Sequence, residues 1–132
     1  MATTVGFIRL FFNHFFSVLA EEGFGILTEI DVKATLKNKI DAEWDNYIIL
    51  GVCNPNLAYQ ALQAEKEIGL FLPCNVIVYE DKESVFVSAI MPTVAMEMIK
   101  NKSLTEIAEQ AEEKLKKVME KLSLDPYALS NK

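Results

Sequence analysis

The chain has 132 residues and a mass of 14.9 kDa, with 51% hydrophobic residues but only 5 Gly and 4 Pro. This composition predicts a single domain over residues 1–132 and excludes a disordered or disulfide-stapled chain. The net charge of -6 argues against nucleic-acid binding, which needs a basic stripe to neutralise phosphates. Two cysteines and no secretory leader predict a cytoplasmic protein that keeps its thiols reduced.

The N-terminal region is predicted as a strand followed by an aromatic helix. Residues 3–9 are rich in β-branched and aromatic side chains, which favours a first strand. From Leu10 the apolar residues fall at helical spacing, and Gly23 is typical of a helix end. Residues 5–20 are too short and too polar to cross a bilayer, so no membrane insertion is expected. The apolar face of this helix comprises Phe12, Phe15, Phe16, Leu19 and Ala20.

Six of the eight phenylalanines precede residue 25, which is more aromatic surface than one helix needs to dock on a sheet. A homodimer surface added to the core accounts for this excess, and C2 symmetry is the default arrangement. The alternatives are a ligand-lining helix and a helix at a membrane surface. The scarcity of nearby Lys and Arg disfavours the membrane alternative.

The next segments alternate strand and helix. Residues 24–30 predict a strand with Ile26, Thr28 and Ile30 on one face. Asp31 is typical of an N-cap, and it predicts a short helix over residues 32–40, followed by a polar loop around Trp44.

The run 47–52 is apolar on both faces, which predicts a fully buried strand. Asn54 and Pro55 then form a helix-start signal, and the helix should fade by Gly69. Pro73 makes the segment 68–72 an extended entry or a loop rather than a central strand.

The C-terminal half begins with the clearest hairpin, formed by residues 76–80 and 84–91 around a turn at Asp81-Lys82 whose type stays open. Residues 94–99 predict a helical turn. Ser103 and Glu106 form a capping box for a long last helix that ends before Asp125-Pro126. The core face of that helix comprises Leu104, Ile107, Ala108, Ala111, Leu115, Val118 and Leu122.

Three stretches of the chain resemble a known family of small bacterial and archaeal proteins, the domain-of-unknown-function family 302. They are residues 23–37 (GFGILTEIDVKATLK), residues 50–55 (LGVCNP) with Ala58, and residues 69–80 (GLFLPCNVIVYE). The resemblance runs from about Gly23 to the last helix.

The resemblance implies an α+β domain with a strand-helix start, a mostly antiparallel sheet with helices packed on it and a long C-terminal helix. This is a β-α-β(4)-α-like arrangement, similar to that of TATA-binding proteins. It also implies a homodimer. It brings no established activity and no cofactor, so whether the protein is an enzyme stays open.

Cys53 and Cys74 are the candidate reactive groups. Cys53 stands just before a predicted helix start, where the helix dipole lowers the pKa of a thiol, and Cys74 begins a strand that can bring it close. Together they could form a reversible disulfide, bind a soft metal or carry sulfur. The plainer interpretation is that both are small buried hydrophobic residues.

Glu29 and Lys33 form a second candidate group, since a carboxylate in an apolar strand needs a partner or solvent. They predict either a salt bridge or a site for a small polar ligand, anionic or sulfur-containing, shared with Cys53, Asn54 and Cys74. His14 is the only histidine, which excludes the usual hydrolytic zinc sites, and no metal site is predicted.

These residues favour a homodimeric binding or carrier domain with its site near the two cysteines. The alternatives are a thiol-dependent redox or sulfur-transfer enzyme, with Cys53 as nucleophile and Cys74 as resolving thiol, and an interaction module that works through the Phe-rich helix.

Overall fold

A computed structural model describes the backbone of residues 2–123 and the side chains of residues 12–122. Its centre is a four-stranded antiparallel sheet in the order β1-β2-β3-β4. The strands are β1 (Gly25–Asp31), β2 (Tyr47–Cys53), β3 (Cys74–Asp81) and β4 (Ser84–Ala89). The predicted α+β class with its antiparallel sheet and long C-terminal helix is confirmed.

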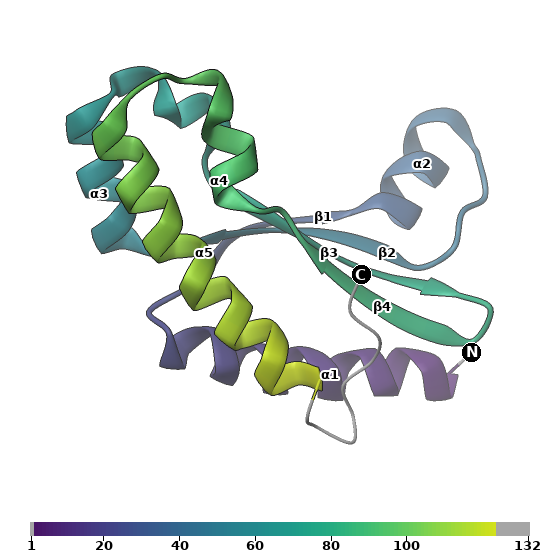
Figure 1. The fold of residues 1–132 in the computed structure, drawn as a ribbon. Helices are drawn as coiled ribbons and strands as arrows, with labels where there is room; N and C mark the ends of the chain where they lie inside the picture. Colours follow the sequence, from purple (N-terminus) through teal and green to yellow (C-terminus); the bar gives the residue numbers. More distant parts are fainter. Residues whose placement is uncertain (1, 124–132) are drawn as a thin grey trace.

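The helices form one layer beside the sheet and one cluster at its end (Figure 1). The long helices α1 (Ala2–Glu21) and α5 (Lys102–Ser123) pack on the same face of the sheet, while α2 stands at the opposite end from α3. The remaining elements are α2 (Val32–Ile40), α3 (Pro55–Ala64), the 3-10 helix η1 (Lys66–Phe71), the short α4 (Pro92–Ala95) and the 3-10 helix η2 (Met96–Met98). Within the described residues, no helix is long and apolar enough to span a membrane.

The strand predicted over residues 3–9 is wrong, because this segment is the first half of α1. A short apolar run does not distinguish a strand from a helix, and here it continues without a break into the amphipathic helix that follows. The predicted helix end is confirmed, since Gly23 has a φ of 80° and closes the last turn. Of the predicted apolar face, Phe15 and Leu19 are buried, whereas Phe16 is 48% exposed.

One face of the sheet carries the main core. Alternate residues of the three strands β2, β3 and β4 point to the side covered by α1 and α5, where Leu115 and Val118 of α5 meet them. A second core forms beyond the end of the sheet between α3, η1, η2 and α5. The buried strand residues of the main core are Leu50, Val52, Val76, Val78, Val85 and Val87.

A bulge in β1 changes the predicted alternation. Ile26 pairs with Val52, but the register shifts between Ile26 and Thr28, so that Thr28 pairs with Gly51 and Glu29 with Leu50. Directly paired residues share a face of the sheet. Ile26 and Thr28 therefore lie on opposite faces instead of the same one.

The long C-terminal helix is confirmed, with its predicted core face buried or partly buried. Its start is corrected. The helix begins at Lys102, and the side chain of Asn101 accepts a hydrogen bond from the Ser103 amide at 3.0 Å, so that Ser103 lies inside the helix rather than at its cap.

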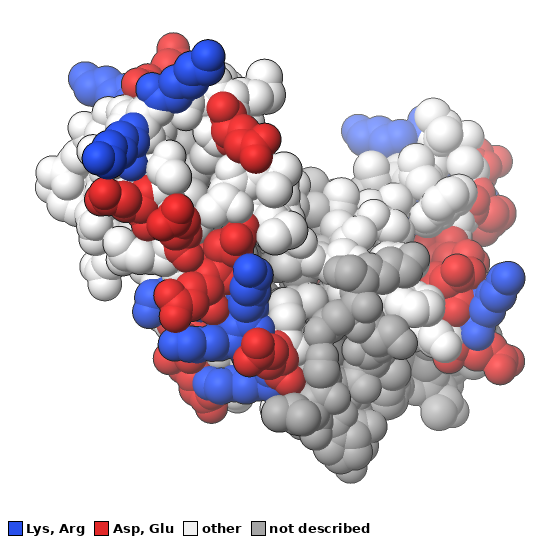
Figure 2. Space-filling model, in the orientation of Figure 1, with Lys and Arg blue, Asp and Glu red and all other residues white. Residues whose placement is uncertain are grey.

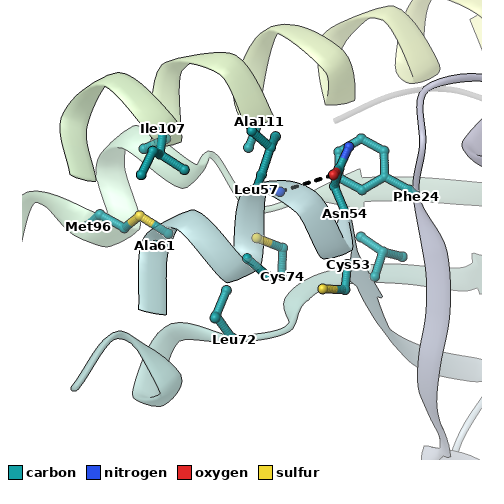
Figure 3. A pocket seen from close by; sticks show the side chains of 13 residues that line it. Phe24, Cys53, Asn54, Leu57, Ala61, Leu72, Cys74, Met96, Ile107 and Ala111 are labelled. Atoms are coloured by element: carbon teal, nitrogen blue, oxygen red, sulfur yellow. Dashed lines mark hydrogen bonds between the residues drawn. The ribbon is translucent and has the colours of Figure 1, made fainter. Parts of the chain in front are cut away.

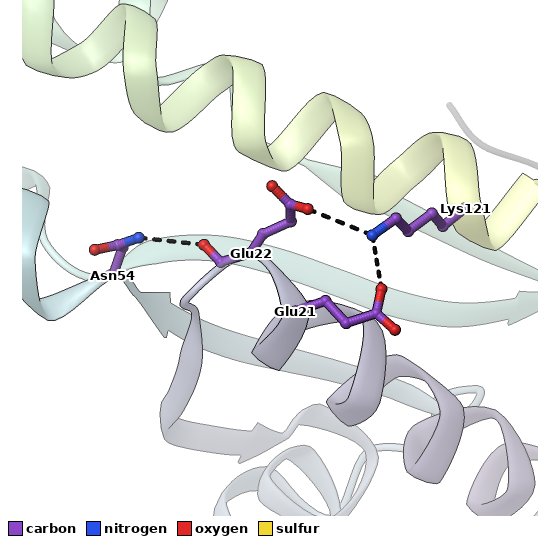
Figure 4. Close-up of polar contacts among 4 residues, drawn as sticks. All are labelled: Glu21, Glu22, Asn54 and Lys121. Carbon is purple, nitrogen blue, oxygen red and sulfur yellow. Dashed lines mark hydrogen bonds and ion pairs between the residues drawn. The ribbon is translucent and has the colours of Figure 1, made fainter.

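The C-terminal ends of α1 and α5 are joined by an ion-pair cluster (Figure 4). The Lys121 ammonium lies 2.6 Å from Glu21 and 3.4 Å from Glu22. The hydrogen bond to Lys121 lowers the pKa of the Glu21 carboxyl, and the same contact raises the pKa of Lys121. The backbone carbonyl of Glu22 also accepts a hydrogen bond from Asn54, which links α1 to the start of α3.

Candidate functional site

A pocket lies where β2 and β3 meet the helices at the end of the sheet (Figure 3). Its enclosed space is about 30 Å³, and the empty space reaches about 380 Å³ only when the open mouth is included. Strand ends form its floor, α3 forms one wall and α5 forms another. The lining residues are Phe24, Val52, Cys53, Asn54, Leu57, Ala58, Ala61, Leu72, Cys74, Met96, Ile107, Ala108 and Ala111.

The strand register brings the two cysteines to this pocket. Cys74 pairs with Val52, so Cys53 is one residue further along the neighbouring strand. Successive side chains of a strand start from opposite faces, so Cys53 and Cys74 leave the sheet from different faces although both line the pocket beyond the strand ends. Disulfide formation needs Cβ vectors that converge, and both cysteines are free. The geometry therefore does not favour a direct disulfide.

Burial keeps both thiols protonated. Desolvation raises the pKa of Cys53. Desolvation, followed by the negative charge that a Cys53 thiolate would carry, raises the pKa of Cys74. The lowered pKa predicted for Cys53 is therefore wrong. The physical reason is burial, and the Leu57 amide at the helix start does not offset it, since this amide donates to the side chain of Asn54 at 3.2 Å.

Asn54 holds the local geometry of the site with both ends of its side chain. Its oxygen caps α3, with Pro55 in the first turn as predicted, and its amide nitrogen donates to the carbonyl of Glu22 at 3.3 Å. A residue that is fixed on both sides positions the start of α3 over the strand ends. The predicted helix-start signal is confirmed.

Glu29 and Lys33 do not belong to this pocket. Cys53 pairs with Gly25, and Glu29 follows four residues later on β1, about 13 Å away at the usual rise per residue. Both residues lie outside the lining of the pocket, and no ion pair joins them within the described part of the chain. Of the nearby lysines, Lys37 is held by Asp41 at 2.6 Å and by Glu43 at 2.9 Å.

Most of the pocket wall was not among the predicted site residues. Phe24, Leu57 and Met96 come from three different segments, and Ile107 and Ala111 come from the apolar face of α5. The helical spacing of α5 did indicate that its face is buried, but no sequence signal indicates that this face meets the cysteines. In the described residues, no three His, Cys, Asp or Glu side chains gather as ligands for a metal ion.

Comparison with known proteins places the chain in a family. Residues 11–122 match the family described as "Domain of unknown function DUF302", and the chain belongs to it. The predicted resemblance is thereby confirmed.

Among solved structures, a protein of the same family is similar to this chain in fold and sequence. It is described as the crystal structure of an uncharacterized conserved protein DUF302 from Bacillus stearothermophilus, and it is 31% identical with a TM-score of 0.72. The similarity covers 81% of this chain and 84% of that chain. No protein with a curated description matches the chain.

Proposed function

We propose that this chain is a binding or carrier domain for a small, uncharged, apolar ligand held in the pocket beside Cys53 and Cys74. The observation that carries the proposal is the character of the wall, since none of its 13 residues bears a formal charge at pH 7. Burial raises the pKa of both cysteines, so the thiols are neutral there as well. A wall of this kind compensates poorly for the desolvation of a charged ligand.

The uncharged wall also distinguishes between the ligand classes that the sequence left open. A small anion would need a cation or free amide groups, and the side chain of Asn54 already occupies the amide of Leu57. A soft metal ion would need deprotonated thiols, and burial opposes their ionisation. A neutral ligand needs neither.

The thiol-dependent enzyme is the alternative function. It requires a nucleophilic thiolate, and the raised pKa values of Cys53 and Cys74 act against one, as does the start of the two side chains from different faces of the sheet. Titration of the two thiols distinguishes the functions, because an enzyme of this type needs at least one thiol with a pKa below the ordinary value.

Fluorescence titration with Nile red, a neutral apolar dye, tests the binding proposal. We expect saturable binding to the wild-type chain and slower alkylation of Cys74 in the dye-bound protein, since Cys74 lines the pocket. Ala58→Leu fills part of the pocket and should weaken dye binding at least tenfold. Ala34→Leu is the matched control on an exposed position of α2 and should leave binding unchanged.

Two outcomes would contradict the binding proposal. Dye binding that leaves the alkylation rate of Cys74 unchanged would place the dye elsewhere on the protein. Equal binding by the wild type and Ala58→Leu, with both proteins folded by circular dichroism, would show that the pocket does not hold the dye.

The proposal includes a homodimer, with a second copy of the chain as the partner. It is supported by Phe16, which is 48% exposed on α1 although Phe15, Val18 and Leu19 of the same helix pack in the main core. Aromatic residues are enriched in interface cores, so Phe16 is the residue through which we expect α1 to meet its counterpart.

A further inference from the structure

A second pocket lies on the other side of α5, between this helix and the end of β4. Its empty space is about 510 Å³ including the mouth, and it shares no lining residue with the pocket beside the cysteines. The chain from Ala89 to Pro92 forms one wall and α5 forms the other, through Glu112, Leu115, Lys116 and Met119.

One half of this second pocket is apolar and partly open to water. Ile90 is 44% exposed and Met91 is 46% exposed at the mouth, opposite Leu115 and Met119. Methionine side chains adapt to ligands of different shape, and covering these groups removes apolar surface from water. This half of the pocket suits a branched or unbranched apolar side chain.

The other half presents one hydrogen-bonded, mostly buried negative charge and one largely exposed positive charge. The Glu112 carboxylate accepts hydrogen bonds through one oxygen from the backbone amide of Thr93 at 3.2 Å and from its hydroxyl at 2.6 Å. Its second oxygen lies 3.7 Å from the Lys116 ammonium. That distance is too long for a hydrogen bond, so the ammonium has donors to offer.

Among the described residues that line this pocket, Glu112 and Lys116 are the two that carry a charge. Figure 2 shows acidic and basic side chains alternating along α5 and a largely uncharged zone beside it. Glu113 and Lys117 have the same spacing one residue further along α5 but do not line the pocket. The apolar wall and the charge pair therefore meet only around Glu112 and Lys116.

We propose that this second pocket binds a small apolar zwitterion of the type of a free apolar α-amino acid. The ligand ammonium pairs with Glu112, the ligand carboxylate pairs with Lys116, and the ligand side chain lies against Met91, Leu115 and Met119. Charge-assisted hydrogen bonds at both ends give the orientation. This site is independent of the proposed function, since it uses other residues and another class of ligand.

Titration of L-leucine into protein with 13C-labelled methionine methyl groups tests the proposal. We expect saturable shifts of the Met91 and Met119 methyl signals, and at least tenfold weaker binding of isocaproate, which lacks the ammonium, and of isoamylamine, which lacks the carboxylate. These ligand changes keep the test valid even where a protein variant is unstable.

Protein variants complete the experiment. Glu112→Gln keeps an acceptor for Thr93 but removes the negative charge. Glu112→Gln and Lys116→Gln should each weaken leucine binding about tenfold. Glu113→Gln and Lys117→Gln are the matched controls and should bind normally. Ala58→Leu should also bind leucine normally, because it alters only the other pocket.

Three results would overturn the inference. They are the absence of saturable shifts at the two methionines, equal binding of leucine and isoamylamine, and loss of leucine binding in Ala58→Leu. The last result alone would move the ligand to the pocket beside the cysteines, and it would leave the proposal of a binding domain standing.

Discussion

At Gly51, β2 lies in close contact with Thr28 of β1 and with Pro73 before β3. An added Cβ would lie 2.5 Å from the ring of Pro73 and closer still to the hydroxyl of Thr28. The proline ring is closed onto the backbone nitrogen, so it cannot rotate away. A side chain at residue 51 would therefore push β1 and the entry to β3 apart, next to the floor of the cysteine pocket.

We accordingly expect Gly51→Ala to destabilise the protein by about 1–3 kcal/mol, as overpacking usually does. Gly25→Ala is the control, because nothing lies within 4 Å of its added Cβ. Urea unfolding of both variants provides the measurement. Equal midpoints for Gly51→Ala and the wild type would mean that the strands can move apart freely.

The two thiols should differ in reactivity because they are buried to different extents. Burial raises the pKa of Cys53 and of Cys74, and Cys53 is the less enclosed of the two. Both should alkylate slowly at pH 7, with apparent pKa values above about 8.5 and with Cys53 reacting faster than Cys74. Alkylation rates measured against pH by mass spectrometry, with Cys53→Ser and Cys74→Ser as single-thiol references, give each value. An apparent pKa of Cys53 below 8.5 would restore the thiol enzyme as the better function.

The same thiols affect stability at alkaline pH. The pKa of each thiol is higher in the folded chain than in the unfolded chain, so unfolding releases protons once the pH passes the unfolded value. The stabilisation from neutral buried thiols is therefore complete below about pH 8.5 and is lost as the pH rises through the folded values.

At the scale of elements, local signals predicted most of the fold. Asp31 and Asn54 each cap the helix that they were expected to cap, because a capping side chain acts within three residues. The errors arose where the outcome depends on distant packing. Residues 3–9 are helical as part of α1, and the bulge in β1 is a property of its pairing with β2, which no local pattern reveals.

The hairpin of β3 and β4 contains a turn that its sequence does not favour. Lys82 and Glu83 have φ values of 49° and 69°, and two positive values are typical of a type I′ turn, which prefers Asn-Gly. Replacing the pair by Asn-Gly should stabilise the protein by about 0.5–1 kcal/mol by relieving this conformation. Thermal unfolding measures the change, with Lys82→Asn alone as the smaller step. A lower melting temperature for Asn-Gly would show that the turn differs from the one described.

The packing of α5 on the sheet depends on Leu115. Leu115 is 3% exposed and packs with the strand residues of the main core. Leu115→Ala should cost about 2–5 kcal/mol, because it removes buried surface and leaves a cavity. Lys117→Ala on the exposed side of α5 is the control and should change stability little. A Leu115→Ala protein as stable as the wild type in chemical unfolding would mean that α5 is not docked.

At the scale of the whole molecule, α5 separates two pockets of different chemistry. Ala108 and Ala111 face the uncharged pocket at the cysteines, and Glu112 and Lys116 face the mixed pocket at β4. The cysteines and Asn54 could be proposed from the sequence because they stand at a strand end and a helix start. The walls could not, because their residues come from segments that meet only in the folded chain.

The proposed homodimer can be tested at Phe16 of α1. Phe16 is half exposed, whereas its neighbour Phe15 is fully buried, so Phe16→Glu should remove an interface contact without opening the core. We expect wild-type protein to sediment as a dimer at micromolar concentration and Phe16→Glu to sediment as a monomer of 14.9 kDa with an unchanged circular dichroism spectrum. Ser17→Glu, on an exposed neighbouring position of α1, controls for added charge and should remain dimeric. A wild-type monomer at every concentration would defeat the homodimer, and a dimer that survives Phe16→Glu would place the interface on another surface.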